Sequence, residues 1–330
     1  MTARPMRWSS ADNGMDGLVL EAFAPQEPGP GELSVEVGAA ALNFSDLLMI
    51  DGTYQVKPPR PFTPGQEVAG VVRAAGPGAR FKPGDRVAGK VEWGGFASHA
   101  IMRDAMAIAI PGDVCLADSA ALPVVYTTAY VALTECTAVS ADETVLVHAA
   151  AGGVGLAAVQ IAAARGAHVI AAAGSETKRA LALEHGASAA IDPGDPEWFR
   201  HCKAMTDGRG IDVVVDPVGG DVTLGCLRVL ANGGRLLIVG FASGSIPQIP
   251  ANRLLLKRAS AIGVYWNHDT DGEMLARVTA RMMDDLLAGR IRPVVDRRSG
   301  LEALPQALGD LAARRTNGKV VLTLNDQPEA

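Results

Sequence analysis

The sequence predicts a two-domain α/β protein, in which a doubly wound parallel sheet is joined to a discontinuous, mainly β domain. The first observation is length, because 330 residues exceed the usual size of a single domain. The second is a regular alternation of apolar runs and helical stretches over residues 121–267, which is typical of parallel sheets. The third is a series of short valine-rich runs before residue 120, separated by Gly and Pro, which favours a small antiparallel barrel.

The predicted β domain comprises residues 1–120 and 268–330. Strands are expected at Glu32–Val37, Glu67–Arg73 and Arg86–Gly89, where apolar residues alternate or cluster between Gly and Pro turns. The chain from about Asp269 is predicted to be helical with a final strand at Lys319–Leu324. Because the parallel sheet is complete before this segment, we expect the segment to return to the N-terminal domain.

The predicted parallel sheet lies within residues 121–267. The stretch Asp118–Cys136 is helical in character, and Asp118 is a candidate N-cap. Buried strands alternate with helices, and right-handed crossovers then place the strands side by side. Six strands in two halves make a Rossmann domain. The strands are Thr144–Ala149, Ala167–Ala173, Ala189–Asp192, Val213–Asp216, Arg235–Gly240 and Ser260–Tyr265. The helices between them include Val154–Arg165, Glu176–His185 and Pro196–Met205.

Composition narrows the class of protein. The formal charge of −6 and the pI near 5.6 argue against nucleic acid as a partner, because phosphate backbones select basic surfaces. Neither a signal peptide nor an apolar span of membrane length is recognisable, so a cytoplasmic location is expected. The four cysteines are far apart in sequence and predict reduced thiols rather than a metal or redox pair.

A glycine-rich turn after the first predicted Rossmann strand predicts a dinucleotide site. Glycine lets the backbone approach a pyrophosphate, and the N-terminus of the following helix presents free N–H groups to the anion. A glycine cluster alone is weak evidence, but here the strand, turn and helix are all in place. The residues of this turn are Ala151, Gly152, Gly153, Val154 and Gly155.

The end of the second Rossmann strand favours NADP over NAD. NAD enzymes place an acid there to hold the ribose hydroxyls, whereas this strand ends in Ala173-Gly174. Ser175 and Lys178 follow, and a hydroxyl with a cation suits a 2′-phosphate. Ser175 could instead be only a helix cap, with Lys178 and Arg179 solvated. Glu176 is a dissenting feature, because it could contact a ribose.

The run Ala150-Ala151-Gly152-Gly153-Val154-Gly155-Leu156-Ala157-Ala158-Val159-Gln160 resembles that of the zeta-crystallin-type quinone oxidoreductases, which belong to the medium-chain dehydrogenase/reductase superfamily. Nearly the whole chain shares the resemblance. The other matching segments are Asn43-Phe44-Ser45-Asp46, Gly52-Thr53-Tyr54, Pro64 to Gly70, Gly84 to Val87, Asp216 to Gly220 and Gly318 to Leu322.

The resemblance implies a GroES-like catalytic domain, a cofactor bound between the domains, and a homodimer formed through the strand Ser260–Tyr265. It places Asn43 and Tyr54 at the nicotinamide and substrate. The remaining cofactor contacts that it implies are Thr128, the glycine turn, Gly174, Ser175, Lys178, Val218, Val239, Gly240, Phe241, Ala242 and Lys319. One departure weakens the argument for NADP, because Pro193 stands where the family often has a tyrosine.

The resemblance also bears on metal. Zinc alcohol dehydrogenases of this superfamily have a Cys where Asn43 stands and a His where Gln66 stands, and the cysteine-rich lobe is missing as well. We therefore expect no metal. Zinc would polarise an alcohol oxygen, so without it the expected reaction is reduction of an activated acceptor such as a quinone or enone.

Three functions stay open. The first is an NADPH:quinone oxidoreductase, and the second is an NADPH-dependent enoyl or haloacrylate reductase on the same scaffold. The third is a non-enzymatic NADPH-binding protein, structural or RNA-binding. Tyr54 is the candidate for orienting or protonating the acceptor, or else it is only a pocket wall. Trp93, Tyr130 and Trp266 either line the acceptor pocket or pack in the core.

Overall fold

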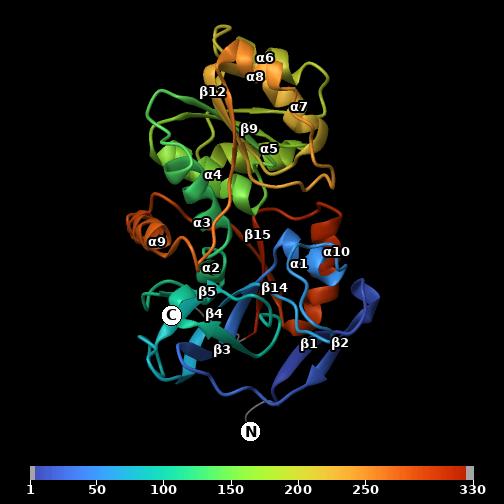
Figure 1. The fold of residues 1–330 in the computed structure, drawn as a ribbon, viewed down its shortest axis with the longest axis vertical. Helices are drawn as coiled ribbons and strands as arrows, with labels where there is room; N and C mark the ends of the chain where they lie inside the picture. The colour runs from blue at the N-terminus through green and yellow to red at the C-terminus, as the bar shows by residue number, and fades with distance from the viewer. Residues whose placement is uncertain (1–3, 325–330) are drawn as a thin grey trace. The chain divides into compact units, whose positions relative to one another are not determined.

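The computed structural model describes residues 4–324, which form two compact units (Figure 1). Unit 1 contains residues up to 124 and residues from 293 onward, and unit 2 contains residues 125–292. The β domain is thus discontinuous in sequence, as the completed Rossmann pattern led us to expect. The chain returns to unit 1 at Pro293, later than the predicted residue 268.

Unit 2 contains a six-stranded parallel sheet in the order β10-β9-β8-β11-β12-β13. Numbered from β8, this is the order 3-2-1-4-5-6 of a Rossmann fold, so the predicted fold class is confirmed. The strands are β8 Thr144–His148, β9 His168–Ala172, β10 Ala189–Ile191, β11 Ile211–Asp216, β12 Leu230–Ile238 and β13 Ser260–Gly263. Every residue of β8 is buried, as a central parallel strand covered on both faces requires.

The helices of unit 2 differ in how far they are buried. Helix α4 (Gly153–Ala164) buries most of its length, from Gly155 to Ala162. Helices α6 (Trp198–Ala204) and α7 (Gly220–Val229) contribute to an apolar cluster together with residues of the strands. Their residues in this cluster include Trp198, Cys202 and Leu227. The other helices that follow strands are α5 (Glu176–Glu184) and α8 (Ala251–Lys257). All four cysteines are free.

Unit 1 is a mainly antiparallel sheet of the order β14-β15-β3-β4-β5-β7, with β6 also paired to β3 and a separate hairpin of β1 and β2. Its strands are β1 Met6–Ser10, β2 Leu18–Ala22, β3 Glu32–Ala41, β4 Glu67–Ala75, β5 Arg86–Lys90, β6 His99–Arg103, β7 Ala107–Ala109, β14 Val295–Ser299 and β15 Lys319–Thr323. Helices α1 (Phe44–Ile50) and α10 (Leu304–Ala312) pack on its apolar core. The sequence analysis predicted β3, β4, β5 and β15 but not the hairpin.

Helix α9 (Gly272–Leu287) explains why the chain returns to unit 1 later than predicted. Its apolar side buries Leu275, Val278 and Met282. The hydroxyl of the fully buried Tyr130 donates to Asp285 Oδ2 at 2.5 Å, which ties α9 to α3 within unit 2. The predicted boundary at residue 268 is therefore wrong, and the boundary at Pro293 lies after this helix.

The stretch expected to be helical over Asp118–Cys136 is helical but interrupted. The segment forms α2 (Leu116–Ala120), α3 (Val125–Tyr130) and a π-helical turn over Val131–Glu135. Pro123 falls between α2 and α3, where it removes a backbone donor from any continuous helix. Cys115 rather than Asp118 is the N-cap of α2, because its sulfur accepts from the Asp118 N–H at 3.3 Å.

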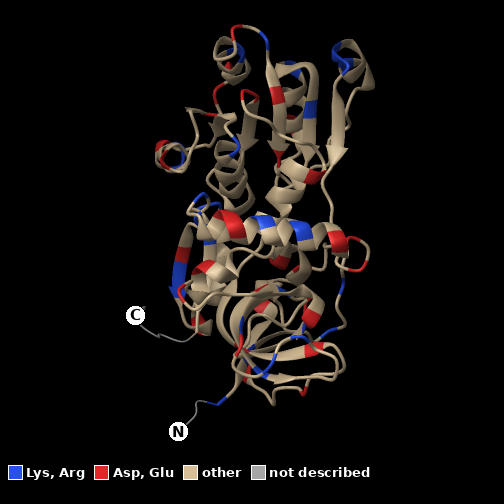
Figure 2. Cartoon of the chain, turned by 90° about the vertical axis from the view of Figure 1, so that its left-hand side faces the viewer, with Lys and Arg blue, Asp and Glu red and all other residues tan. Residues whose placement is uncertain are grey.

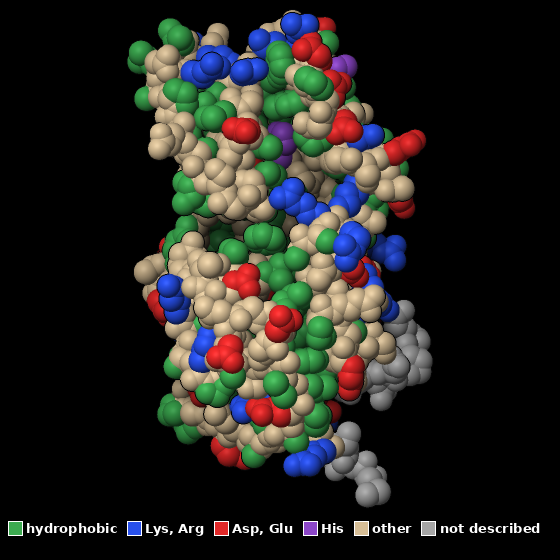
Figure 3. Space-filling view, turned by 90° about the vertical axis from the view of Figure 1, so that its right-hand side faces the viewer, with side chains coloured by type: hydrophobic (Ala, Val, Ile, Leu, Met, Phe, Trp, Pro, Cys, Tyr) green, Lys and Arg blue, Asp and Glu red, His purple; other side chains and the backbone are tan. Residues whose placement is uncertain are grey.

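Charged residues of both signs are distributed along the helices and loops (Figure 2). The face shown in Figure 3 likewise has cationic and anionic side chains interspersed with hydrophobic ones. Within residues 4–324, none of the helices has both the length and the apolar character needed to cross a bilayer.

Candidate active site

The glycine turn in unit 2 has the geometry of an anion cradle. Ala149, directly after β8, lies in the left-handed region with a φ of 49°, which redirects the chain into α4. A Cβ on Gly155 would lie 2.2 Å from the Ala149 carbonyl oxygen, so only glycine fits there. The first N–H groups of α4 have no partner within the helix and face the turn. Of the predicted cofactor residues, this turn brings together Ala151, Gly152, Gly153, Val154 and Gly155.

The end of β9 is followed by the predicted phosphate-binding residues. Ser175 is the N-cap of α5, and its Oγ accepts from the Lys178 N–H at 3.3 Å. Gly174 has open space around its Cα, and Lys178 is half-buried in the first turn of α5. A hydroxyl and a cation thus adjoin the positive end of a helix, an arrangement that favours an anion.

Arg179 has a defined structural role that the sequence analysis did not foresee. Its Nη1 donates to the Ala173 carbonyl at 2.9 Å and to Asp192 Oδ2 at 3.1 Å. This guanidinium therefore links the ends of β9 and β10. Asp192 is the residue that directly follows β10, so an acid at the end of the third strand was the available signal.

Hydrogen bonds join the loops that follow β11 and β12. The Ala242 N–H donates to the Pro217 carbonyl at 3.1 Å, and the Ser243 N–H donates to the Val218 carbonyl at 2.9 Å. The predicted nicotinamide-side residues Val218 and Val239 to Ala242 are therefore brought together. Thr128, on α3, accepts a hydrogen bond from Trp266 Nε1 at 3.0 Å.

The buried carboxylate of Asp216 shapes the first of these loops. Asp216 Oδ1 accepts from the N–H groups of Val218 at 2.8 Å and Gly219 at 3.1 Å. Its Oδ2 accepts from Thr223 Oγ1 at 2.5 Å. The side chain is 1% exposed, so this carboxylate is compensated by protein donors rather than by water. Asp216 had been noted only as part of a motif.

In unit 1, Asn43 lies in a buried polar cluster with Glu67 and Lys319. Lys319 Nζ lies 2.5 Å from Asn43 Oδ1 and 2.7 Å from Glu67 Oε2. Asn43 Nδ2 donates to Glu67 Oε2 at 3.1 Å, and Glu67 Oε1 accepts from the Val124 N–H at 2.7 Å. Lys319 was expected to contact the cofactor, but its ammonium group is engaged by these two side chains.

Asp46 is a second buried acid beside this cluster. Its Oδ2 accepts from the Asn43 N–H at 2.7 Å, and its Oδ1 is buried without a hydrogen-bond partner among residues 4–324. Desolvation raises the pKa of Asp46 to about 7, against the lowering effects of the Asn43 N–H and of Lys319. The carboxyl group therefore changes its charge near neutral pH.

Gln66 and Ser45 complete the polar side chains at this place. Ser45 Oγ donates to Gln66 Oε1 at 2.5 Å. Within the described part of the chain, no group of three or more His, Cys, Asp or Glu side chains is arranged to hold a metal ion. Tyr54, the other predicted catalytic residue, lies after α1, and its N–H donates to the Leu48 carbonyl at 3.1 Å.

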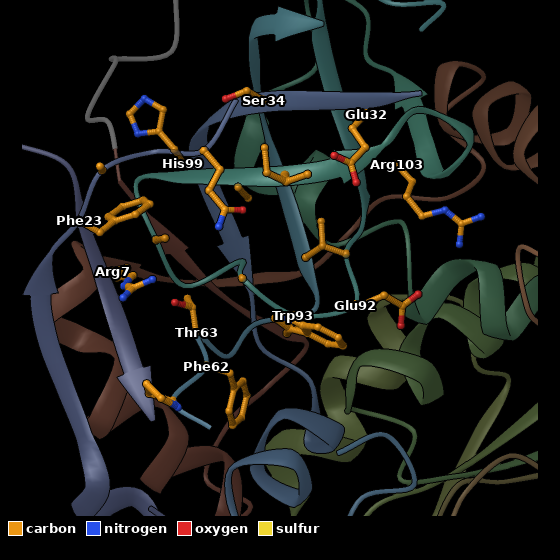
Figure 4. Close-up of a pocket in the computed structure, with 18 of the residues that line it drawn as sticks. Arg7, Phe23, Glu32, Ser34, Phe62, Thr63, Glu92, Trp93, His99 and Arg103 are labelled. Atoms are coloured by element: carbon orange, nitrogen blue, oxygen red, sulfur yellow. The ribbon is translucent and has the colours of Figure 1, made fainter. Parts of the chain in front are cut away.

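Unit 1 also has a cavity of about 470 Å³ (Figure 4). The aromatic rings of Phe23, Phe62 and Trp93 form part of its wall, and the buried Thr63 and Ser34 also line it. Trp93 lines this cavity and is 39% exposed, so it does not pack in the core. The lining includes neither Asn43 nor Tyr54, so this cavity is distinct from the cluster around Asn43.

Comparison with known proteins agrees with this architecture. Residues 29–112 match the family described as alcohol dehydrogenase GroES-like domain, and residues 153–281 match the family described as zinc-binding dehydrogenase. The first match lies within unit 1 and the second within unit 2. The zinc-binding description belongs to that family as a whole, whereas Asn43 and Gln66 stand at two of the expected ligand positions in this chain.

Relatives match over nearly the full chain. The rat quinone oxidoreductase-like protein 2 is 39% identical over 311 residues, which cover 93% of this chain and 89% of the rat protein. The human quinone oxidoreductase is 33% identical over 300 residues, or 90% of each chain. The structure of Escherichia coli quinone oxidoreductase complexed with NADPH has a TM-score of 0.89 at 29% identity, covering 97% of this chain and all of that one.

A GroES-like domain combined with a Rossmann domain defines a medium-chain dehydrogenase/reductase. Within that superfamily, the chain belongs to the quinone oxidoreductase and quinone oxidoreductase-like family. The resemblance drawn from the motifs is confirmed.

The buried Asp46 predicts a pH-dependent stability. Its pKa in the folded state lies above the usual value of 3.8, so the favourable contribution of the protonated group is complete below pH 3.8 and is lost as the pH rises to about 7. The stability of the wild type relative to Asp46→Asn should therefore fall by about 2 to 3 kcal/mol between pH 5 and pH 8, at about 1.4 kcal/mol per pKa unit. Urea unfolding of both proteins at each pH measures this difference.

The comparison with Asp46→Asn removes the contributions of other groups, such as the buried His148, whose pKa desolvation lowers to about 4. The amide oxygen of the replacement can still accept from the Asn43 N–H. A difference in unfolding free energy that stays constant from pH 5 to pH 8 would show that Asp46 is already ionised at pH 5.

Proposed function

We propose that this protein is an NADPH-dependent oxidoreductase that transfers a hydride to a quinone or a similarly activated acceptor without zinc. The observation that carries the proposal is the combination of a glycine cradle, with Ser175 and Lys178 beyond it, and a polar cluster around Asn43. In residues 4–324 no three His, Cys, Asp or Glu side chains are arranged there to hold a metal ion. Two structural neighbours, a mycobacterial protein and the E. coli quinone oxidoreductase, are complexed with NADPH.

The residues of unit 2 fit a dinucleotide in three places. The turn after β8 would hold the pyrophosphate, because the N-terminus of α4 presents its first N–H groups there. Ser175 and Lys178 would hold the 2′-phosphate. The joined loops at Val218 and Val239 to Ala242 would contact the nicotinamide. When bound, NADPH supplies the hydride, and the protein supplies position and electrostatics.

Asn43 supports reduction of an activated acceptor rather than alcohol oxidation. A zinc ion would lower the pKa of an alcohol, and the amide groups of Asn43 and Gln66 are poor zinc ligands compared with Cys and His. Quinones and enones accept hydride without that activation if they are held correctly. Enoyl or haloacrylate reduction would use the same groups and is separated from quinone reduction only by the acceptor.

The cofactor preference should depend on Lys178. A charge-assisted contact is typically worth about 1.5 to 3 kcal/mol, so Lys178→Ala should raise the KM for NADPH by roughly tenfold or more. The kinetics with NADH should change little, because NADH lacks the 2′-phosphate. Steady-state kcat and KM for both cofactors, in wild type and variant, measure this effect.

Arg179→Ala is the matched control on the same helix turn. Because Arg179 binds Ala173 and Asp192, its loss should lower stability and affect both cofactors similarly. Equal losses for NADPH and NADH in Lys178→Ala would assign Lys178 a structural role. A wild type that prefers NADH would overturn the proposed cofactor.

The acceptor class and the independence from zinc are tested together. Turnover with NADPH and 1,4-benzoquinone or a conjugated enone should exceed ethanol oxidation with NADP, because no Lewis acid activates the alcohol. Elemental analysis should give well under one zinc per chain, and a chelator should leave activity unchanged. The proposal is contradicted if ethanol oxidation is faster than quinone or enone reduction. It is also contradicted if the protein contains stoichiometric zinc and the chelator removes both zinc and activity. Activity with enones alone favours the alkene reductase.

We also propose a homodimer formed through the edge of the sheet at β13. Among residues 4–324 this strand pairs only with β12. Exposed apolar side chains adjoin it, namely Leu255 (77% exposed), Leu256 (79%) and Tyr265 (77%). An open apolar strand edge favours association with a second chain.

Light scattering at micromolar concentration should give twice the 34.2 kDa of one chain. The double variant Leu255→Lys/Leu256→Lys should shift the measured mass toward that of one chain. A monomeric wild type would exclude this dimer.

A further inference from the structure

Two buried charges, one at each end of the side-chain amide, fix the orientation of Asn43. Lys319 Nζ donates to Asn43 Oδ1 at 2.5 Å, and Asn43 Nδ2 donates to Glu67 Oε2 at 3.1 Å. Reversing the amide would place its NH₂ group against the ammonium and its carbonyl oxygen against the carboxylate. Both contacts would be repulsive, and a buried site screens such repulsion weakly. One amide orientation is therefore strongly favoured.

This orientation leaves one N–H group of Asn43 for a ligand. The amide nitrogen carries two hydrogens, and Glu67 accepts one of them. Across residues 4–324, no side chain or backbone group accepts the other. Asn43 is 7% exposed, so a ligand that reaches it meets a hydrogen-bond donor in a site with little competing water.

We propose that Lys319 and Glu67 are positioning residues, which hold the Asn43 amide so that its second N–H donates to the oxygen of the hydride acceptor. The proposal rests on the proposed function, which supplies a quinone or enone as that acceptor. Lys319 is 4% exposed and Glu67 is fully buried, so both charges are held in place by the protein rather than by solvent. The Val124 N–H fixes the other oxygen of the Glu67 carboxylate at 2.7 Å.

The reaction creates a charge where this donor would act. A quinone that takes up a hydride from NADPH gains two electrons and one hydrogen. The C–H bond of the dihydronicotinamide breaks, NADP⁺ forms, and the quinone becomes a hydroquinone monoanion with its charge on oxygen. A proton from water then completes the hydroquinone. A fixed N–H at that oxygen stabilises the developing charge, and Lys319 strengthens the donor by polarising the amide through Oδ1.

Gln66 shows why the charged partners matter. Its Oε1 contacts the hydroxyl of Ser45, and a hydroxyl can either donate or accept. Both orientations of the Gln66 amide therefore keep a hydrogen bond with Ser45. The ammonium and carboxylate groups around Asn43 do not allow that choice.

The test removes the charge that fixes the amide oxygen. Lys319→Met should lower kcat for benzoquinone by at least about tenfold. Complete loss of a donor to a developing oxyanion costs roughly 10²- to 10³-fold in rate. The effect here is smaller, because the Asn43 amide is still present and only its orientation is lost. The Kd for NADPH, measured by fluorescence titration, should stay within about threefold. Arg235→Met, which removes a cation from the part-buried ion pair with Glu143 in unit 2, is the matched control and should lower stability with kcat unchanged.

Removing Lys319 alone leaves Glu67 without its cation, and such a variant can fail to fold. Lys319→Met/Glu67→Gln removes both charges together and keeps similar volumes, so it should fold and show the same loss of kcat. Thermal melting confirms folding before kinetics are measured. A folded variant of either kind with kcat within twofold of wild type overturns the proposal.

A binding measurement separates this proposal from the proposed function. In the presence of NADP⁺, 4-nitrophenol serves as a probe for a hydroquinone anion, and its absorbance reports the phenolate. Wild type should lower the pKa of the bound probe below that of free 4-nitrophenol, and Asn43→Leu should abolish this shift. An unchanged shift in Asn43→Leu, or no bound phenolate in wild type, counts against the oriented donor. Failure of wild type to reduce any quinone or enone refutes the proposed function instead.

Discussion

The ion pair between Lys319 and Glu67 determines much of the arrangement of unit 1. It joins the first residue of β15 to the first residue of β4, two strands that lie on either side of β3 in the sheet. Burying two charges costs several kcal/mol per ion, and only mutual attraction and further hydrogen bonds offset that cost. Asn43 and the Val124 N–H provide those bonds. The C-terminal strand therefore has to reach its place in the sheet before the polar cluster around Asn43 is compensated.

Unit 2 uses a similar principle with a single buried charge. Asp216 has no cation among its hydrogen-bond partners, and two backbone N–H groups with one hydroxyl satisfy its carboxylate. These bonds fix the loop after β11, to which the loop after β12 is in turn hydrogen-bonded. Gly219, in this loop, has a φ of 77°, a conformation that favours glycine. A buried acid at the end of a strand thus sets the backbone of a predicted cofactor-binding segment.

The sequence predicted the features that depend on local pattern. The six parallel strands were identified because each is an apolar run with a helix or turn on either side, and the glycine turn because its neighbours are a strand and a helix. It did not predict the contact between Asn43 and Lys319, which are 276 residues apart. Nor did it predict that α9 stays with unit 2, since an amphipathic helix does not reveal which surface its apolar side covers. Pro123 is the residue in the sequence that indicates a break between α2 and α3.

The pair Arg179 and Asp192 changes how the end of β9 should be understood. A cation near the 2′-phosphate site normally raises affinity for NADPH, but this guanidinium is already paired with a carboxylate and a carbonyl. Its net attraction for a second anion is correspondingly reduced, because Asp192 neutralises it at 3.1 Å. Lys178, one residue earlier and in the first turn of α5, is the cation that we propose for the 2′-phosphate. The position of Arg179 in the sequence does not reveal this pairing, because Asp192 comes from the end of a neighbouring strand.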